Sequence, residues 1–353
     1  MNSPSKQDSE NPTSKEDCEL LYHYTDEAGL SGIIEHDNIW ATHVRFLNDW
    51  TELREAFREK YVEFLIDSFC EGLPAGLDED VRRIIDRISA KRNVGKILKI
   101  IESPNSPNET FVFCLTGSAE AWQKSAPDPG DRLSQWRAYS HSSQGFSLGF
   151  DKKLLGERIE LNNRYAKASL LRCIYEEDER TAFFREIGRD ASSLFEAQRQ
   201  SDEPTPAWFH TNKPDASEEY KKLNSYFLSA LSKATAEFFA KAAQIKHSGF
   251  REEFEWRIIF QAHKDALYRN PKNPSFVKFR NGHFGRIPYI EIPLSLKEID
   301  KSPLRRIIVG PGARSEDVKH SVELLLLGNG IQVRPPDDAK GVEVSTSQIP
   351  YRQ

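Results

Sequence analysis

The sequence lacks the features that mark several large protein classes. Its four cysteines, Cys18, Cys70, Cys114 and Cys173, lie far apart, without the close pairs of a zinc knuckle or a redox motif. No apolar run approaches the ~18 residues that a membrane span requires. The N-terminus has no basic-then-apolar secretory pattern. The sequence therefore predicts a reduced, cytoplasmic, soluble protein that has no membrane partner.

The charge balance and the missing motifs narrow the field further. The 353 residues include 49 Lys and Arg against 54 Asp and Glu, a formal net charge of −5. This balance argues against a protein that coats nucleic acid through bulk electrostatics, although a local basic groove is compatible with it. The sequence contains no Gly-x-Gly-x-x-Gly, no P-loop and no His-Glu-x-x-His, so the best-known nucleotide and zinc-protease signatures are absent.

The chain does contain ample core material, since 38% of its residues are hydrophobic and 11% are aromatic. Residues 2–17 carry no large apolar side chain, so we expect a disordered tail over 1–18. Strands occur in both halves of the chain with helical blocks between them, which predicts a single α+β domain over 19–353. Helical insertions are expected near 49–102 and 180–247.

Periodicity locates the individual elements. Aromatic and aliphatic runs predict strands over 20–25, 39–42, 111–116, 145–151, 170–175, 253–261, 276–279, 288–292, 304–309 and 331–333. Apolar residues at helical spacing predict helices over 29–35, 49–71, 81–101, 133–139, 180–200, 217–247 and 315–327.

Two stretches mix aromatic residues with polar or charged ones. In 22–25, Tyr-His-Tyr-Thr, His23 is either a hydrogen-bonded core residue or part of a site. In the second stretch, Trp136 and Tyr139 either anchor a helix on the core or stack on a planar ring. Arg137 correspondingly makes a structural ion pair or binds a phosphate through its bidentate fork.

A third stretch places two carboxylates close together. In a strand over 253–261, Glu253 and Glu255 point to the same face because side chains alternate. Such a pair is costly unless both carboxylates are solvated, paired with cations or used in a site. Arg251 and Arg257 share that face and can neutralise it, so a structural and a functional interpretation both remain open.

These stretches resemble the bacterial domain of unknown function 2971 family. The similar segments are 21–25, 46–49 with Glu52, 134–139, 145–151, 249–250, 253–257, 308–311 and 347–352. The resemblance runs from about Leu20 to Arg352, and its Gln-Trp-Arg and Glu-Trp-Arg pieces are fairly specific. The family name itself implies no activity.

A second, more distant resemblance implies an activity. The strand at 22–25, the Gly-Leu helix after it and the Ile-Trp-Ala-Thr strand at 39–42 look like the start of ADP-ribosyltransferases of the His–Tyr–Glu type. Members of that superfamily carry a late Glu-x-Glu or Gln-x-Glu, and 253–255 is similar to it. The resemblance implies an ADP-ribosyltransferase-like mixed sheet core with large helical insertions, with NAD as substrate and no metal.

The same resemblance implies roles for individual residues. The catalytic set is Glu255, His23 and Tyr139, and the NAD-contacting set is His23, Tyr24, Arg137, Trp136 and Glu253. His23 would bond a ribose hydroxyl, Tyr139 would stack on nicotinamide, and Arg137 would meet the pyrophosphate. Glu255 would bind the nicotinamide ribose and stabilise the oxocarbenium-like transition state, as a fixed carboxylate can. The alternative that Glu253 is the functional carboxylate stays open.

The expected function is therefore ADP-ribosyl transfer or NAD hydrolysis by a bacterial toxin or phage-defence effector. A nucleic-acid or protein acceptor is expected, because a large helical insertion can shape a docking surface. Two alternatives remain. One is a nuclease or hydrolase in which Asp49, Glu52, Glu253 and Glu255 hold a divalent metal. The other is a non-catalytic sensor or interaction protein on the same fold. The sequence does not indicate an oligomeric state.

Overall fold

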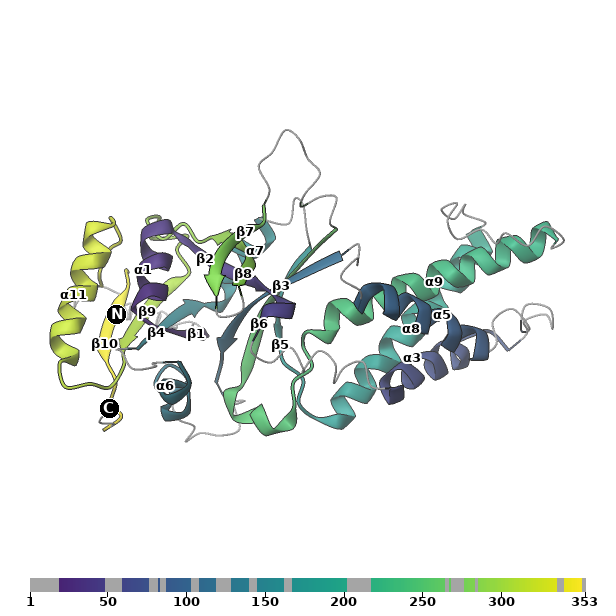
Figure 1. Cartoon of the computed structure of the whole chain (residues 1–353), viewed down its shortest axis with the longest axis horizontal. Coiled ribbons are helices and arrows are strands. Elements are labelled where there is room, and N and C mark those ends of the chain that lie inside the picture. Colours follow the sequence, from purple (N-terminus) through teal and green to yellow (C-terminus); the bar gives the residue numbers. More distant parts are fainter. Residues whose placement is uncertain are drawn as a thin grey trace, which may run out of the picture.

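In the computed structural model of the chain, a long mixed sheet is joined at one end to a group of packed helices (Figure 1). The structure describes residues 19–47, 59–75, 82, 87–102, 108–118, 128–139, 145–161, 167–201, 217–263, 267, 276–282, 285–334 and 340–350. The predicted tail over 1–18 lies outside these residues, as does the first part of the helix predicted over 49–71.

Among the described residues the sheet has ten strands. Its order is β10-β9-β4-β1-β3-β2-β8-β7, with β6 between β3 and β5 in a branch. The strands are β1 Leu20–Thr25, β2 Asn38–His43, β3 Asn108–Thr116, β4 Phe146–Asp151, β5 Lys167–Arg172, β6 Glu255–His263, β7 Lys278–Gly282, β8 Gly285–Pro293, β9 Leu304–Val309 and β10 Glu343–Thr346. The β9–β10 pair is parallel and the other named pairs are antiparallel. The expected mixed sheet with helices around it is confirmed.

Helices cover the sheet and extend beyond it. They are α1 Glu27–His36, α3 Glu59–Glu71, α5 Arg87–Glu102, α6 Leu133–Tyr139, α7 Lys152–Leu161, α8 Glu177–Ser201, α9 Glu218–Ala242 and α11 Ser315–Gly328, with 3-10 turns η1 Val44–Phe46 and η3 Ser248–Glu253. None of the described helices combines the length and apolarity that crossing a membrane would require.

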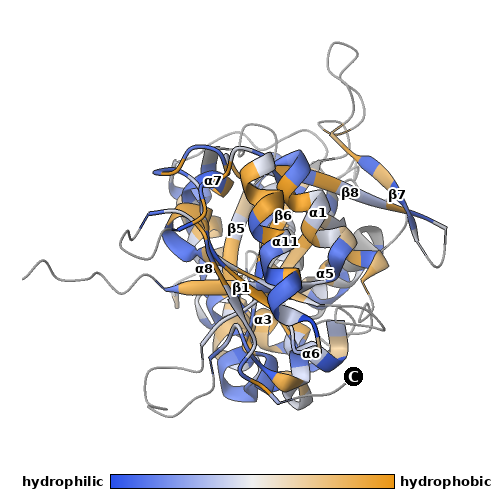
Figure 2. Ribbon diagram, turned by 90° about the vertical axis from the view of Figure 1, so that its left-hand side faces the viewer, coloured by the Kyte–Doolittle hydropathy of each residue, from blue (hydrophilic) through white to orange (hydrophobic). Residues whose placement is uncertain are grey.

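Two large apolar clusters hold these elements together. One lies under the sheet and includes Leu21, Phe113 and Ile258. The other fills the helical body formed by α3, α5, α8 and α9, around side chains such as Phe69 and Phe184 (Figure 1). Viewed from the α11 end, hydrophobic segments gather towards the middle of the molecule (Figure 2), as burial of apolar surface requires.

The first helix shows how local signals set element bounds. Asp26 caps α1, because its carboxylate accepts the N–H of Gly29 at 2.9 Å. The helix ends at Asp37, whose backbone is left-handed with φ 54°, a conformation that Asp tolerates better than most residues. The described helix therefore extends the predicted range of 29–35 by two residues at its start and one at its end.

Two predicted boundaries near the carboxylate pair are wrong. The strand predicted over 253–261 begins only at Glu255, after the 3-10 turn η3 and the left-handed Phe254 with φ 44°. Glu253 and Glu255 are therefore not alternate residues on one strand face. The helix predicted over 217–247 ends at Ala242, because the chain leaves it for a bridge between Ile245 and Ile174.

Other differences are local. The helix α7 was not predicted, since its apolar residues are few and interrupted by charges. The strand predicted over 331–333 is only a single bridge between Val333 and Val342, and the regular strand β10 follows at Glu343–Thr346. The pairing partner β9 decides this outcome, because a strand forms where backbone groups find a neighbour.

Candidate functional site

A cavity of about 330 Å³ opens where β1 and β2 separate from each other along β3. β2 pairs with one part of β3, through Thr42 and Val112. β1 pairs with the end of β3, through Tyr22 and Thr116. Between these two registers β3 has no partner on that side among the named strand pairs, and Cys114 lines the cavity there.

Small residues of α1 form one wall of this cavity. Ala28, Gly29 and Gly32 line it. A Cβ on Gly29 would lie 1.9 Å from the hydroxyl oxygen of Thr25, so a larger residue there would require the Thr25 side chain to move. A Cβ on Gly32 would meet nothing within 4 Å, so that glycine leaves space open at the wall.

His23 projects from β1 into the cavity as a neutral side chain. Its Nδ1 lies 3.0 Å from the carbonyl oxygen of Cys114, so Nδ1 carries the hydrogen and donates it, because a carbonyl can only accept. Burial, with the ring 4.3 Å from that of Phe113, lowers the pKa of His23 to about 4. At neutral pH its Nε2 is therefore a hydrogen-bond acceptor.

Glu255, at the start of β6, is fixed by two cations. Arg257 donates from Nε to one carboxylate oxygen at 2.8 Å and from Nη2 to the other at 3.0 Å. Lys246 Nζ lies 2.5 Å from Glu255 and 2.6 Å from Glu253. Burial alone would raise the pKa of Glu255, but Arg257 and Lys246 lower it to about 2. Glu255 is therefore an ionised, buried carboxylate in the cavity wall.

Neighbouring elements also fix the backbone of Glu255. Its N–H donates to the hydroxyl oxygen of Tyr175 at 2.9 Å, and its carbonyl accepts from the N–H of Cys173 at 2.8 Å. Arg257 Nη1 in turn donates to the carbonyl of Ala243, just past α9, at 2.7 Å. The carboxylate thus has one orientation, set by β5, β6 and the end of the helical body.

Tyr175→Phe is expected to lower the free energy of unfolding by about 1–3 kcal/mol, because it leaves the buried N–H of Glu255 without its acceptor. Urea unfolding followed by circular dichroism measures this change. Tyr289→Phe is the matched control, since Tyr289 is also buried and its hydroxyl has no hydrogen-bond partner in the part of the chain that the structure describes. Equal losses in the two variants would contradict the assigned role.

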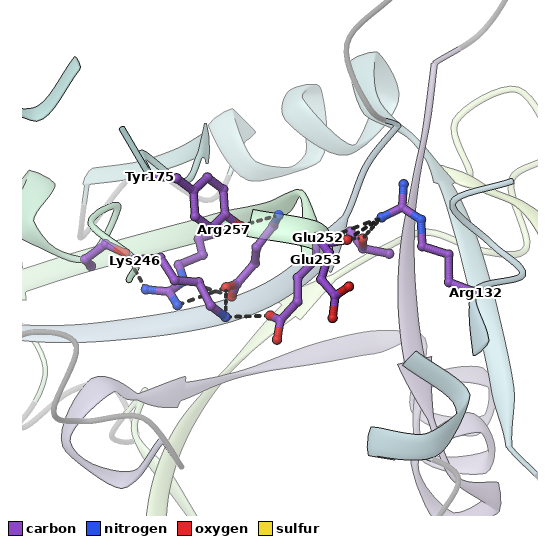
Figure 3. Close-up of polar contacts among 9 residues, drawn as sticks. Arg132, Tyr175, Lys246, Glu252, Glu253 and Arg257 are labelled. Atoms are coloured by element: carbon purple, nitrogen blue, oxygen red, sulfur yellow. Dashed lines mark hydrogen bonds and ion pairs between the residues drawn. The ribbon is translucent and has the colours of Figure 1, made fainter. Parts of the chain in front are cut away.

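Arg132 holds the turn that precedes β6. Its guanidinium donates to the carbonyl of Gly117 at 2.9 Å and to the hydroxyl of Thr116 at 3.2 Å, and it lies 4.9 Å from the centre of the Phe254 ring. The Thr116 hydroxyl donates to the carbonyl of Glu253, and Arg132 also reaches the carbonyls of this turn (Figure 3). These contacts sustain the left-handed Phe254, a conformation that costs energy in a non-glycine residue.

Tyr139 reaches the site from α6. A hollow of about 50 Å³ adjoins the main cavity and shares His23, Cys114, Tyr139 and Glu255 with it. Gln135 lines this hollow too, since residues four apart lie on one face of a helix. Tyr139 is 44% exposed, so it stands at the mouth. Partial burial and the nearby Cys114, Glu253 and Glu255 raise its pKa, which keeps the phenol neutral.

The structure separates the remaining predicted residues. Glu253 and Tyr24 border the smaller hollow. Trp136 is not among the residues that line either space. It is buried edge-to-face against Tyr24 at 4.8 Å, and its Nε1 donates to Asp131 at 2.7 Å. Arg137 is exposed on the outer side of α6 and does not line the cavity. Residues two apart on a helix do not share a face, so α6 does not present both Arg137 and Tyr139 to one site.

The sequence patterns did not predict several residues of the site. Lys246 and Arg280 line the cavity, Tyr175 binds the backbone of Glu255, and Arg132 binds the turn that precedes it. Lys246 lies four residues beyond a strongly amphipathic helix, which is a weak signal. Arg280 lies on a short strand whose pattern is not distinctive.

The described residues give no support to a divalent metal held by Asp49, Glu52, Glu253 and Glu255. Asp49 and Glu52 lie outside the described residues. Within the described ones, no group of three or more His, Cys, Asp or Glu is arranged to hold a metal. Lys246 contacts both Glu253 and Glu255, and cations on these oxygens oppose a second cation there.

A family model described as "Protein of unknown function (DUF2971)" matches residues 135–258. This confirms the family resemblance over a central part of the chain. The matched segment includes Tyr139, Lys246, Glu253, Glu255 and Arg257, but neither β1 with His23 nor the hairpin with Arg280. Comparisons with curated proteins and with solved structures gave no match.

Proposed function

We propose that the protein cleaves NAD and transfers its ADP-ribosyl group, or hydrolyses NAD, in the cavity between β1 and β2. The observation that carries this proposal is that His23, Tyr139 and Glu255, which lie on three different elements, line one cavity. A cavity of about 330 Å³ lies within the range of small-molecule sites.

The side chains suit the chemistry of glycosidic cleavage. The bond between the nicotinamide nitrogen and the ribose carbon breaks, and nicotinamide leaves with the electron pair. The ribose carbon then bonds to an acceptor oxygen or nitrogen, which loses its proton, and water is the acceptor in hydrolysis. The ionised Glu255 stabilises the positive charge that develops on the ribose. The neutral His23 accepts a hydrogen bond from a ribose hydroxyl at Nε2, and the Tyr139 ring stacks on nicotinamide.

The charge of the cavity supports an anionic substrate. Of the described residues that line it, Lys246, Arg257 and Arg280 are cations, and Glu255 alone is an anion. The whole chain nevertheless carries a formal charge of −5. A positive cavity in an acidic protein attracts anions selectively, and the pyrophosphate of NAD is one.

The proposal extends to the fold and the setting. The resemblance described from the sequence supports an ADP-ribosyltransferase-like core, and the divergence of β1 and β2 along β3 supplies its cleft. By the same resemblance, we infer a bacterial toxin or phage-defence effector with a macromolecular acceptor. The helical body supports this acceptor class, because α9 runs from it to Ala242 at the cavity wall.

Release of nicotinamide from NAD by the purified full-length chain tests the proposal, with and without added cell nucleic acid or protein. Glu255→Asp keeps the charge but draws the carboxylate back, and release is expected to fall by about 10²–10³-fold, as for loss of other electrostatic stabilisers. Glu253→Asp is the matched control and is expected to retain most of the activity.

The outcomes separate the alternatives. A loss confined to Glu253→Asp would assign the functional role to that carboxylate, and the assignment of Glu255 would fall. Absence of release by the wild type under every condition, together with no thermal shift on adding NAD, would overturn the proposed function. A metal-dependent hydrolysis without NAD would then be the next activity to measure.

A further inference from the structure

The end of the cavity near β7 carries a positive charge that no carboxylate of the described residues balances. Arg280 donates from Nη2 to the hydroxyl oxygen of Thr42 at 2.9 Å, and its guanidinium lies 5.8 Å from the centre of the Trp40 ring. A guanidinium has five N–H donors, so these contacts leave most of them unused.

The other two cations among the described residues of the cavity have a carboxylate partner, which Arg280 lacks. Lys246 and Arg257 bind Glu255 directly, at 2.5 Å and 2.8 Å. The carboxylate of Glu291, on the described part of the same hairpin, pairs with Lys278 at 2.5 Å. Burial lowers the pKa of Arg280, since this burial is not offset by an anion. Such a group gains most from a ligand that brings a negative charge.

The same face of β2 carries further unmatched polar atoms. The side-chain oxygen of Asn38 and the indole nitrogen of Trp40 are buried and have no hydrogen-bond partner among the described residues. Both residues line the cavity. Buried polar groups normally find partners, so this end of the cavity has the character of a ligand site that the protein itself does not satisfy.

The register of the sheet sets the separation between this end and Glu255. Arg280 bonds to Thr42, which lies opposite Val112, while Glu255 lies opposite Thr116. Four residues of strand correspond to roughly 13 Å. The long side chains of Arg280 and Glu255 shorten the gap that a ligand must span. A ribose joined to a diphosphate is an elongated group of suitable length.

We propose that Arg280 binds a phosphate of the substrate diphosphate and so fixes which end of the substrate meets Glu255. The inference rests on the proposed function for the identity of the substrate, and it replaces Arg137 by Arg280 as the pyrophosphate contact. The bidentate fork of arginine matches a phosphate, and the Trp40 ring, which stacks on Tyr289 at 4.5 Å, limits where the guanidinium can lie.

Isothermal titration of the full-length chain with ADP-ribose tests this inference. Arg280→Gln is expected to weaken binding about 10–100-fold, as loss of a charge-assisted hydrogen bond does. Arg280→Lys keeps the charge without the bidentate fork, so its affinity for ADP-ribose is expected to lie between those of the wild type and Arg280→Gln. Arg286→Gln is the matched control, because Arg286 is exposed on the same hairpin and does not line the cavity. Nicotinamide riboside, which lacks the diphosphate, is expected to bind all four proteins equally.

Inorganic pyrophosphate is the second probe, and it makes the two proposals separable. Pyrophosphate binding that Arg280→Gln abolishes, in a protein that never releases nicotinamide, would support the phosphate site and overturn the proposed NAD chemistry. Nicotinamide release by the wild type, with unchanged ADP-ribose affinity in Arg280→Gln and Arg280→Lys, would overturn the phosphate site and leave the NAD chemistry standing. Equal weakening by Arg286→Gln would also overturn it, since the effect would then be one of general charge.

Discussion

Glu255→Gln is expected to lower the free energy of unfolding by about 3–5 kcal/mol, because the buried Arg257 loses its anion and the buried Lys246 keeps only the partly exposed Glu253. Lys246 and Arg257 are each about 5% exposed, as is Glu255 itself. Removing the charge of one partner does not remove the desolvation of the other two. Urea unfolding at neutral pH measures this change in the free energy of unfolding. The measurement does not depend on any enzymatic activity.

Two further variants test whether the loss of stability comes from removing the carboxylate beside the buried Lys246 and Arg257. Glu63→Gln breaks an ion pair of 2.9 Å with Lys91 whose side chains are both more than a third exposed, so its effect is expected to stay within about 1 kcal/mol. Adding Lys246→Met to Glu255→Gln is expected to recover part of the lost stability, since the buried charge of Lys246, which then has lost its contact with the Glu255 carboxylate, disappears. A Glu255→Gln loss no larger than that of Glu63→Gln would contradict the description of this cluster.

The stability of the protein is expected to fall by about 2–3 kcal/mol as the pH drops from about 6.5 to about 4, because of His23. The folded pKa of His23 is lowered to about 4. Over this range the unfolded chain therefore takes up a proton that the folded chain does not. The contribution of His23 is fully present above pH 6.5 and is lost as the pH falls towards 4.

Urea unfolding at several pH values measures this dependence, and His23→Gln is expected to flatten it. His320→Gln is the matched control, because that side chain is 72% exposed on α11. Glu255 contributes in a lower window, since its pKa is lowered from 4.5 to about 2 and its stabilisation is lost only as the pH falls through that range. Identical pH profiles for the wild type and His23→Gln between pH 6.5 and 4.5 would contradict the buried, neutral histidine.

Much of the local structure follows from the sequence. The predicted ranges 20–25, 133–139 and 304–309 coincide with β1, α6 and β9. Their alternating or helical patterns are properties of neighbouring residues, so a short window contains the information. Boundaries failed where distant groups decide them, as at the start of β6, where Arg132 and Thr116 bind the backbone of the preceding turn.

The sequence by itself also singled out His23, Tyr139 and Glu255, through a resemblance and through unusual polar residues among aromatic ones. It did not indicate that Arg137 lies outside the cavity lining, because the direction in which Arg137 points depends on which face of α6 packs on the sheet. That face is fixed by Trp136, which is buried against Tyr24. A pattern of seven residues does not contain this choice.

Only the tertiary structure decided that the three residues share a cavity. Thr116 of β3 pairs with Tyr22 on one side and with Glu255 on the other. Segments more than two hundred residues apart in the chain therefore lie within two strands of each other. Local composition sets what each strand and helix is, but the register between distant strands depends on the packing of the whole sheet. The meeting of these three side chains at one cavity follows from that register.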